Sequence, residues 1–394
     1  MRIAIVHPTN WPHVRRGTER FMNELAEFMG HRGHEVAIVT SKAGRNEISR
    51  ARAYTTEYHR RYWHPAMGRA GILDFHLFPL TTLAYLLRKR VDIVHCFNFP
   101  DAVAAAWARP FTGARVILHL GNIPPDVRYR RELSSGGRIL RWAVQAADEV
   151  ITVSAAQRDI FAKRCGRSGA LIRVPVDTER FALSRTRDSA RPIILCASAL
   201  EDPRKGGRIL MRAFNGVKRM RPGARLQISS LLTPGLTREL LQIIEPEWRA
   251  DVQFPGTGEI QDLPGLLGRA SVLVLPSLWE ALPLILSEAM ATGTPVVGTQ
   301  AGGIPELITS PRLGRVFDPG PNNGAEPSNV DGLTQAILET LALSLLPETA
   351  LHCRAAVMQS DWSVLGPVYE DLYRRAIARR DPLTHGARPN QAPG

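Results

Sequence analysis

Short apolar runs rich in β-branched residues alternate with amphipathic stretches along most of this chain, and no other feature constrains its fold as strongly. In the first half, the expected strands cover residues 2–8, 35–40, 92–97, 115–120 and 149–154. After the first of them, Phe21, Leu25 and Phe28 recur at helical spacing. Strands that alternate with helices form a parallel sheet with helices on both faces, so we expect a doubly wound α/β domain.

The alternation pauses at residues 171–190, where prolines and charges replace the periodic pattern, and then resumes. In the second half, the expected strands cover residues 192–198, 225–230, 252–256, 271–277, 295–299 and 314–319. With 394 residues, the chain exceeds the usual size of a single core. The sequence therefore predicts two Rossmann-like doubly wound parallel-sheet domains facing a cleft, at residues 1–180 and 190–360. Composition further predicts a surface loop at 319–329 and a disordered tail at 385–394.

The chain contains four cysteines, Cys96, Cys165, Cys196 and Cys353. They are far apart and form no C-x-x-C pair, which argues against a zinc site or a disulfide framework and favours a reducing compartment. No charged and apolar leader precedes the first expected strand, and no apolar run is long enough for a membrane-spanning helix. We expect a cytoplasmic protein.

The chain carries 50 Lys and Arg against 37 Asp and Glu, a formal net charge of +13. Such an excess favours an anionic partner: nucleic acid, a phosphate-bearing substrate or an acidic membrane surface. No known nucleic-acid-binding module accompanies the charge, so we expect no nucleic acid partner. A dinucleotide oxidoreductase is also disfavoured, because no G-x-G-x-x-G sequence follows the first expected strand.

Residues 279–289, "WEALPLILSEA", place two acids, Glu280 and Glu288, around an apolar run. The run follows an expected strand, and in open α/β sheets ligands bind beyond the carboxyl ends of the strands, beside helix N-termini. Carboxylates accept hydrogen bonds from the hydroxyls of a ribose or a hexose, so the pair suits a nucleotide-sugar. The structural alternative is that Pro283 begins a helix whose apolar residues pack inward and whose dipole favours nearby acids.

The segment "EDPRKGG", residues 201–207, follows the first expected strand of the second half. Arg204 can form a forked pair with a phosphate, and Lys205 supplies a compact positive charge. Gly206 and Gly207 allow the backbone to approach a ligand closely. An isolated surface Arg-Lys pair usually serves solubility alone, but the position after a strand end favours a binding role here.

The first half offers weaker signals. Gly17, in "RRGTER", precedes the first expected helix and can point backbone amides at an anion, although a plain turn also explains one glycine. His95 and His119 end expected strands, and we expect both to face the cleft, with a structural role as the alternative for each. In the second half, "AGGIPELI" at 301–308 predicts either a further helix start, with Glu306 near its N-terminal end, or a tight turn with a cap.

The block "LPSLWEALPLILSEAMATGTPVVGTQAGGIPEL", residues 275–307, resembles the signature of the retaining glycosyltransferases of family 4, which have the two-domain GT-B fold. The segments "GTERFMNELAEFMGHRGHEVAIVT", "DIVHCF", "AADEVITVS" and "RKGGRILMRAF" resemble further segments of the family in the same order. Residues 361–380 resemble its closing helix, which crosses back to the first domain. The resemblance covers most of the chain and identifies a family without identifying a substrate.

The resemblance implies a retaining hexosyltransferase that uses a nucleotide-diphosphate sugar such as a UDP- or GDP-sugar. It implies an acceptor glycan, lipid or small molecule in cell-surface glycan, glycolipid or secondary-metabolite biosynthesis, with no cofactor and no required metal. Retention without an obvious nucleophile implies an oxocarbenium-like, same-face attack in which the departing phosphate takes the acceptor's proton. The implied catalytic residues are His119, Glu280, Arg204 and Lys205; the implied donor-binding residues are Gly17, Arg204, Lys205, Glu280, Leu282, Pro283, Leu284 and Glu288.

By the same resemblance, Glu288 binds the donor ribose, Glu280 contacts the transferred sugar, and the Arg-Lys pair neutralises the diphosphate. The chain departs from the family pattern in its first loop, where Arg16 and Gly17 stand in place of two glycines. It also lacks the asparagine-glycine that usually follows the hinge proline, since residues 174–181 read "VPVDTERF". These departures leave the donor unassigned.

Residues 49–71 interleave arginines with Tyr54, Tyr58, Tyr62 and Trp63, a composition that suits anionic lipid headgroups. We therefore keep an anionic membrane surface as a candidate partner, with a peripheral location at its inner face; a soluble acceptor and a solvated face are the alternatives. Two other functions stay open: a nucleotide-sugar enzyme of the same fold that transfers nothing, such as an epimerase, and a basic nucleic-acid binder.

Overall fold

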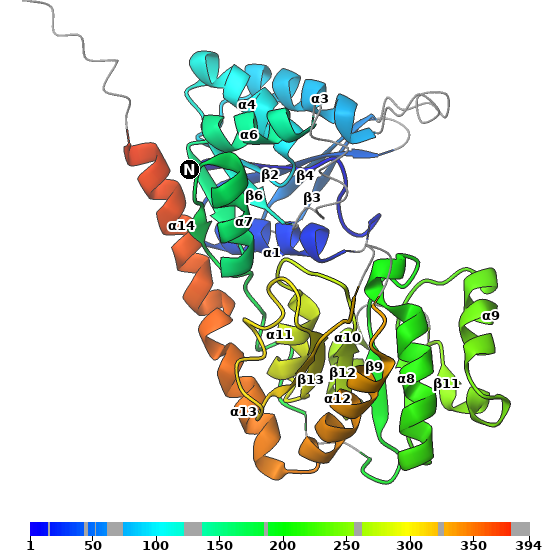
Figure 1. The fold of residues 1–394 in the computed structure, drawn as a ribbon. Coiled ribbons are helices and arrows are strands. Elements are labelled where there is room, and N and C mark those ends of the chain that lie inside the picture. The colour runs from blue at the N-terminus through cyan, green and yellow to red at the C-terminus, as the bar shows by residue number, and fades with distance from the viewer. Residues whose placement is uncertain are drawn as a thin grey trace, which may run out of the picture.

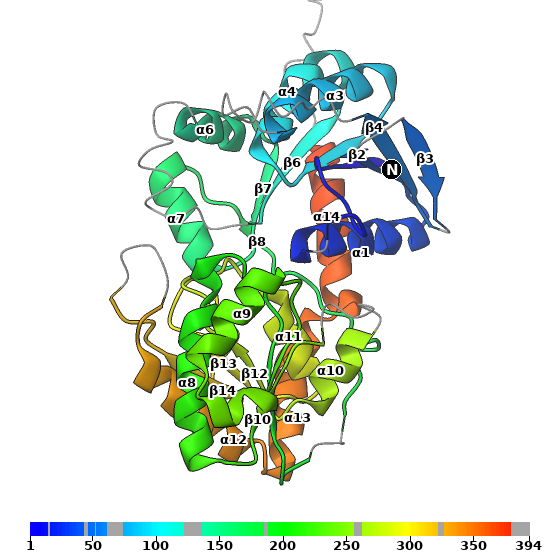
Figure 2. The same cartoon turned by 90° about the vertical axis from the view of Figure 1, so that its right-hand side faces the viewer.

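The structure is a computed structural model that describes residues 1–14, 16–42, 46–51, 53–60, 74–121, 136–184, 188–255, 262–321 and 327–379. The chain forms two α/β units, one above the other, and a long helix near the C-terminus runs beside both (Figure 1, Figure 2). The predicted fold class, two doubly wound domains, is confirmed.

The N-terminal unit is built on a sheet in the strand order β3-β4-β2-β1-β5-β6-β7-β8. Its strands are β1 (Arg2–Val6), β2 (Glu35–Lys42), β3 (Glu47–Arg50), β4 (Thr55–Arg60), β5 (Ile93–Cys96), β6 (Arg115–Leu120), β7 (Glu149–Thr152) and β8 (Ala170–Leu171). Every neighbouring pair is parallel except β3 with β4. In the middle, Ile3 pairs with Val36 on one side and with Ile93 on the other.

The C-terminal unit is built on a second, all-parallel sheet in the order β11-β10-β9-β12-β13-β14. Its strands are β9 (Ile193–Cys196), β10 (Arg225–Ile228), β11 (Val252–Gln253), β12 (Val272–Leu275), β13 (Val296–Thr299) and β14 (Gly314–Phe317). In both sheets the chain leaves its first strand in one direction and later returns to continue on the other side. Each sheet therefore has a switch point, next to β1 and β9 respectively, where ligands of such folds bind.

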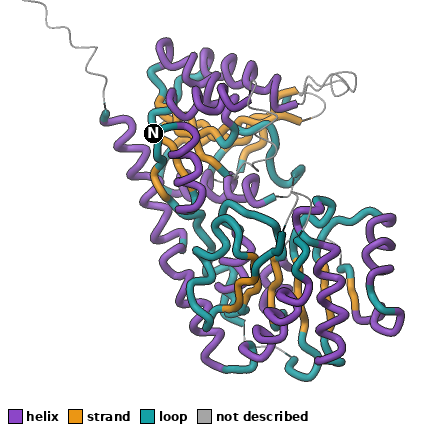
Figure 3. Tube along the Cα trace, in the orientation of Figure 1, coloured by secondary structure: helices purple, strands orange, loops and turns teal. Residues whose placement is uncertain are grey.

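Helices cover both faces of each sheet (Figure 3). In the N-terminal unit they are α1 (Gly17–His31), α3 (Asp74–Arg88), α4 (Phe99–Thr112), α6 (Gly136–Ala146) and α7 (Ala155–Cys165). In the C-terminal unit they are α8 (Gly207–Met220), α9 (Pro234–Ile243), α10 (Leu263–Arg269), α11 (Leu284–Ala291), α12 (Val330–Leu343) and α13 (Pro347–Val357), and α14 (Trp362–Ala378) closes the chain. Short 3₁₀ helices cover Pro203–Lys205, Pro246–Asp251 and Met358–Ser360.

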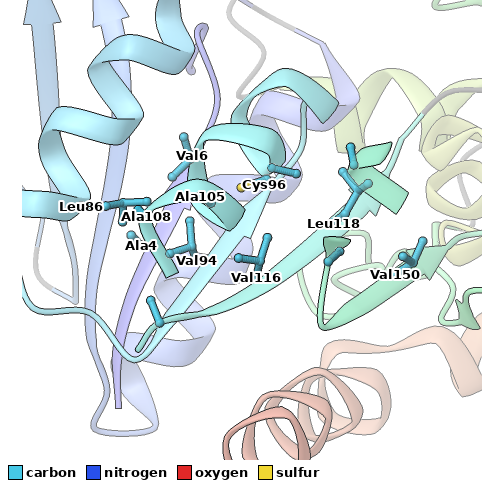
Figure 4. Close-up of a cluster of buried hydrophobic side chains, with 14 of the residues drawn as sticks. Ala4, Val6, Leu86, Val94, Cys96, Ala105, Ala108, Val116, Leu118 and Val150 are labelled. Atoms are coloured by element: carbon cyan, nitrogen blue, oxygen red, sulfur yellow. The ribbon is translucent and has the colours of Figure 1, made fainter. Parts of the chain in front are cut away.

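Alternating residues of the central strands pack into two hydrophobic clusters, one on each face of the sheet. Ala4 and Val6 on β1 point into a cluster under α3, α4 and α6 (Figure 4). Ile3 and Ile5 point to the opposite face, into a cluster shared with α1 and α14. Because both faces of the sheet are covered, its central strands are mostly apolar, and this makes them recognisable as short continuous runs.

Helix α14 completes the core of the N-terminal unit. Asp361 caps it, since its carboxylate accepts a hydrogen bond of 2.8 Å from the backbone N–H of Ser363. The ring of Trp362 stacks on that of Phe28 from α1 with centroids 5.4 Å apart. Gly366 lies so close to the same phenylalanine that a Cβ there would be 2.3 Å from Phe28 Cζ.

Each predicted strand is present, most of them shortened at the ends, and the predicted first helix is confirmed. The sequence analysis missed β3, β4 and β8. The first two overlap residues 49–71, for which an anionic membrane surface was one candidate partner, and two of the tyrosines of that segment are engaged within the protein. Tyr58 is buried, and Tyr54 donates a hydrogen bond of 2.8 Å to Asn23. The remainder of that segment, with Tyr62 and Trp63, and the predicted tail at 385–394 lie outside the described residues.

All four cysteines are buried and free. Across the described ranges, none of the helices combines the length and the apolar character that crossing a bilayer requires.

We expect Gly366→Leu to destabilise the protein by about 1–3 kcal/mol, because the new side chain collides with Phe28 and displaces α14. The matched control is Gly235→Leu in α9, where a Cβ meets no atom within 4 Å. Thermal unfolding of both variants separates packing from helix propensity, which changes equally in the two. Equal unfolding midpoints would contradict the close packing at Gly366.

Candidate functional site

The switch point of the C-terminal sheet is formed by the loops that follow β9 and β12. These loops hold one another: the backbone N–H of Leu278 donates to the carbonyl of Arg204 at 2.7 Å. Gly206 has a φ of 75°, and a Cβ there would be 2.4 Å from the carbonyl oxygen of Pro276, so a glycine is required at the junction. The two loops therefore present their side chains as one surface.

Arg204 lies on the 3₁₀ helix Pro203–Lys205, whose cap is Asp202. Its Nε is 3.0 Å from Asp202 Oδ1, and its Cζ lies 4.8 Å from the ring centroid of Trp279. Burial raises the pKa of Asp202, but the hydrogen bonds from Arg204 outweigh this and hold the pKa below its ordinary value. The guanidinium is thus held in the loop by a carboxylate on one side and an indole on the other.

Lys205 pairs with the first acid of the "WEALPLILSEA" segment. Its Nζ lies 2.6 Å from Glu280 Oε1, and both side chains remain partly open to solvent. The backbone of Glu280 is fixed by the segment 301–308: Gly303 N–H donates to Glu280 O at 3.0 Å, and a Cβ on Gly302 would be 1.9 Å from that oxygen. A lysine and a glutamate are therefore juxtaposed at the mouth of the site.

Glu288 is the fifth residue of α11 and is only 2% exposed. One of its oxygens, Oε1, forms an ion pair with Arg20 from α1 of the other unit. The other oxygen, Oε2, is buried and has no hydrogen-bond partner within the described residues. An unpaired buried carboxylate oxygen is costly, so this atom is poised to accept a hydrogen bond from a ligand.

The first turns of α1 and α11 face each other across the two units. Gly17 begins α1, and a Cβ on it would be 3.5 Å from Leu284 Cδ1 at the start of α11. Pro283 precedes α11 and provides no capping side chain for the first-turn amides, while Leu282 packs against a small cluster formed by Val153 and Ala281. Two helix N-termini, each favourable for an anion, therefore lie at the junction of the units.

His119 lies near the end of β6 and is 2% exposed. Its ring packs on Phe21 with centroids 5.3 Å apart, and Phe21 lies on the same first turn of α1 as Gly17 and Arg20. The prediction that His95 also faces the cleft is wrong. His95 is fully buried behind His119, because α14 covers it.

Of the two alternatives predicted for 301–308, the helix start is wrong and the tight turn is confirmed, since the segment forms turns. Its Glu306 instead caps α7 of the other unit, accepting hydrogen bonds of 2.9 Å from the N–H groups of Ala155 and Ala156. A carboxylate at that helix N-terminus joins the two units a second time.

The structure thus brings Arg204, Lys205 and Glu280 together in one group and Gly17, Leu284 and Glu288 in a second, with His119 behind α1. The sequence analysis missed Arg20 and Trp279. A signal for Arg20 exists, because it follows Gly17 by three residues and therefore lies on the same helix face.

A cavity of about 270 Å³ lies elsewhere, at the opposite edge of the N-terminal sheet, beside Arg2, Asp92 and Arg115. Asp92 is paired with Arg2 at 2.8 Å, and Arg115 with Asp148 at 3.1 Å, so these charges already have partners. We place the functional site at the carboxyl ends of the strands because the unpaired carboxylate oxygen and the helix N-termini meet there. Among the described residues, no group of three or more His, Cys, Asp or Glu could hold a metal ion.

This arrangement can bind a ligand that carries both hydroxyls and phosphates. Glu288 and Glu280 can accept hydrogen bonds from diols, while Arg204, Lys205 and the helix N-termini can bind a diphosphate.

Comparison with known proteins places the chain in a family. A family model described as "Glycosyltransferase Family 4" matches residues 15–180, and one described as "Glycosyl transferases group 1" matches residues 191–342. The sucrose-phosphate synthase of Thermosynechococcus elongatus has the same fold, with a TM-score of 0.79 at 19% identity over 96% of this chain and 100% of that structure. The GT-B fold is confirmed.

Curated relatives include a "GDP-mannose-dependent alpha-(1-6)-phosphatidylinositol monomannoside mannosyltransferase" of Mycolicibacterium smegmatis, 32% identical over 223 residues. This match covers 52% of the chain and about half, 55%, of that relative's length. A "Phosphatidyl-myo-inositol mannosyltransferase" of Propionibacterium freudenreichii subsp. shermanii is 23% identical over 385 residues, covering 95% of this chain and 94% of the relative.

The buried pair between Arg20 and Glu288 generates a prediction. We expect Arg20→Ala and Glu288→Ala each to lower the free energy of unfolding, because each single change leaves a buried charge unpaired. The double variant should lose less than the sum of the two single losses, with a coupling energy of about 1–3 kcal/mol. Urea unfolding of the wild type, the two single variants and the double variant measures this coupling energy.

The control cycle uses Arg375 and Asp371, an exposed pair on α14 with nitrogen and oxygen 3.3 Å apart, where we expect little coupling. Strict additivity at Arg20 and Glu288 would mean that the pair does not hold the units together.

Proposed function

The chain belongs to the glycosyltransferases of family 4, and we propose that it transfers a hexose-type sugar from a nucleotide-diphosphate sugar to an acceptor hydroxyl, with retention at the anomeric carbon. The observation that carries the proposal is the buried Oε2 of Glu288, which has no partner among the described residues. A ribose hydroxyl of the donor would supply the missing hydrogen bond, and the phosphates would then lie toward the helix N-termini.

The leaving group of this reaction is a nucleoside diphosphate, whose negative charge grows as the bond to the sugar breaks. Arg204 and Lys205 supply two positive charges at the switch point, and α11 adds its N-terminal dipole. Lys205 is paired with Glu280. Binding of the diphosphate would draw the ammonium away and leave Glu280 free to accept a hydrogen bond from a hydroxyl of the transferred sugar.

The reaction balances without a protein nucleophile. The bond between the anomeric carbon and the phosphate oxygen breaks, and the acceptor oxygen forms its bond on the same face. The acceptor hydroxyl gives its proton to the departing phosphate oxygen, so the products are the glycosylated acceptor and a nucleoside diphosphate. The chain's own part is to bind both substrates, to exclude water and to stabilise the leaving charge.

The relatives support a choice of donor and acceptor classes to test. The names of two of them specify mannosyl transfer to phosphatidylinositol-based acceptors, one of them from GDP-mannose. We therefore propose GDP-mannose as the first donor to test and a lipid-linked or glycan polyol as the acceptor, within cell-surface glycan or glycolipid biosynthesis. An epimerase-like enzyme would act on the donor alone, so dependence of product formation on an added acceptor distinguishes the two.

A lipid acceptor requires the protein to meet a membrane surface. Trp107 and Phe111 on α4 and Trp142 on α6 are exposed by 62%, 81% and 41%, and the two tryptophan rings lie 6.1 Å apart. Exposed Arg138 and Arg141 follow the same face of α6. Aromatic side chains beside arginines suit the boundary of an anionic bilayer, and α4 and α6 lie at the end of the molecule away from the C-terminal unit (Figure 2). We propose a peripheral location at the inner face of the membrane.

We expect Glu288→Ala to weaken nucleotide binding, and Arg204→Ala and Lys205→Ala each to lower kcat by about 10- to 1000-fold, because each removes a group that stabilises the departing diphosphate. Nucleotide release from UDP-, GDP- and ADP-sugars measures both effects. Arg208→Ala is the matched control, since Arg208 lies on the next turn and pairs with Glu239. Unchanged kinetics in the three site variants would remove the proposed site.

We expect vesicles that contain phosphatidylglycerol to bind the protein at low salt, with about tenfold weaker partitioning for the double variant Trp107→Ala/Phe111→Ala, because two aromatic contacts with the bilayer are lost. Met220→Ala, at an exposed apolar position of the C-terminal unit, is the control and should partition like the wild type. Cosedimentation with the vesicles measures the partitioning of each protein. A wild-type protein that ignores anionic vesicles would refute the membrane proposal.

A further inference from the structure

A row of three hydrogen-bonding side chains runs from the closing helix through β5 to His119 on β6, beside α1. Tyr373 on α14 contacts His95 on β5 through its hydroxyl and the ring Nδ1. On the other side of the same ring, His95 Nε2 lies 3.2 Å from Nδ1 of His119 on β6. Tyr373 and His95 are fully buried, and His119 is 2% exposed. Of the three, only His119 is a residue that the family resemblance implies for the site; the other two have no role so far.

Both imidazoles are neutral at physiological pH. Burial, together with the neighbouring His119, lowers the pKa of His95 well below its ordinary value. Burial lowers the pKa of His119 to about 3. A neutral imidazole carries one N–H, so each ring has one nitrogen that donates and one that accepts. Two directions of donation along the row are then available.

The hydroxyl of Tyr373 decides between them. Among the described residues, its only hydrogen-bonding partner is Nδ1 of His95. If His95 donated from Nδ1, the buried O–H of Tyr373 would have no acceptor, and its desolvation would go uncompensated. The favourable direction is therefore donation from Tyr373 to His95 Nδ1, which places the proton of His95 on Nε2.

The proton position on His95 determines that on His119. His95 Nε2–H donates to Nδ1 of His119, so the single proton of His119 must be on Nε2. The Nε2 of His119 has no partner among the described residues. Stacking against Phe97 and Tyr369, with centroids 4.7 and 6.1 Å away, holds the ring plane.

We infer that Tyr373 and His95 are positioning residues that fix His119 in the tautomer protonated on Nε2, so that His119 meets the donor sugar as a hydrogen-bond donor. This inference rests on the proposed function for the identity of the ligand, while the tautomer itself does not depend on it. His119 would then grip an oxygen of the transferred sugar and would not act as a general base. Helix α14, near the C-terminus, would thereby determine the tautomer of His119.

Nitrogen-15 NMR of protein labelled at histidine reads the tautomer without any substrate, so a failure of the proposed transfer activity would leave this test intact. We expect wild-type His119 to show a protonated Nε2 and an unprotonated Nδ1, with assignment by His119→Gln. Protonation of His119 on Nδ1 in the wild type would overturn the inference, whatever the tyrosine variants show.

Two tyrosine variants on α14 test the cause. Tyr373→Phe removes the hydroxyl that orders the row, so we expect His119 to become a mixture of both tautomers. Tyr369→Phe is the matched control: Tyr369 is also fully buried, but its hydroxyl donates to the backbone carbonyl of Arg173 at 3.3 Å and takes no part in the row. An unchanged His119 spectrum in Tyr373→Phe, or an equal change in Tyr369→Phe, would overturn the assignment of Tyr373.

The same variants have a functional readout once a donor is known. Equal populations of the two tautomers halve the competent fraction, so Tyr373→Phe should weaken apparent donor binding by about twofold or more, whereas binding of the free nucleoside diphosphate stays unchanged. A loss of equal size for both ligands would indicate a general structural defect and contradict a role at the sugar.

Discussion

The site depends on the meeting of two helix N-termini, those of α1 and α11, at the carboxyl ends of two parallel sheets. Parallel strands place all their following loops at one edge, and the two units turn these edges toward each other (Figure 1). The buried pair between Arg20 and Glu288 forms at this meeting point. Because this pair joins the units directly, the geometry of the proposed donor site depends on how the two units dock.

Each charge proposed to bind the donor already has a partner within the protein. Arg204 is held by Asp202, Lys205 by Glu280, and Glu288 by Arg20. A nucleotide-sugar would therefore bind by exchanging partners: its phosphates replace carboxylates, and its hydroxyls take up carboxylate oxygens. Such an exchange costs less than uncovering unpaired charges, because each cation gains a phosphate and Glu280 gains a hydrogen bond in place of its ion pair.

Local features of the site were predictable from sequence, and long-range ones were not. Arg204, Lys205 and Glu280 lie in the segments after β9 and β12, and Glu288 lies in the helix that follows β12, so the order of strand, loop and helix locates them. The pair of Arg20 with Glu288 joins residues 268 positions apart, and its formation depends on how the units dock. His95 was expected in the cleft because its strand ends there, yet α14, from 278 positions further along, covers it. The strands β3 and β4 escaped notice because their arginines and polar residues hid an edge of the sheet.

The most direct test of the central claim is a crystal structure of the protein with the nucleoside diphosphate of its donor. The account predicts a ribose hydroxyl within hydrogen-bonding distance of Glu288 Oε2 and phosphate oxygens at Arg204 and Lys205, with Lys205 withdrawn from Glu280. A nucleotide bound elsewhere, or one whose ribose leaves Glu288 Oε2 without a partner, would contradict it.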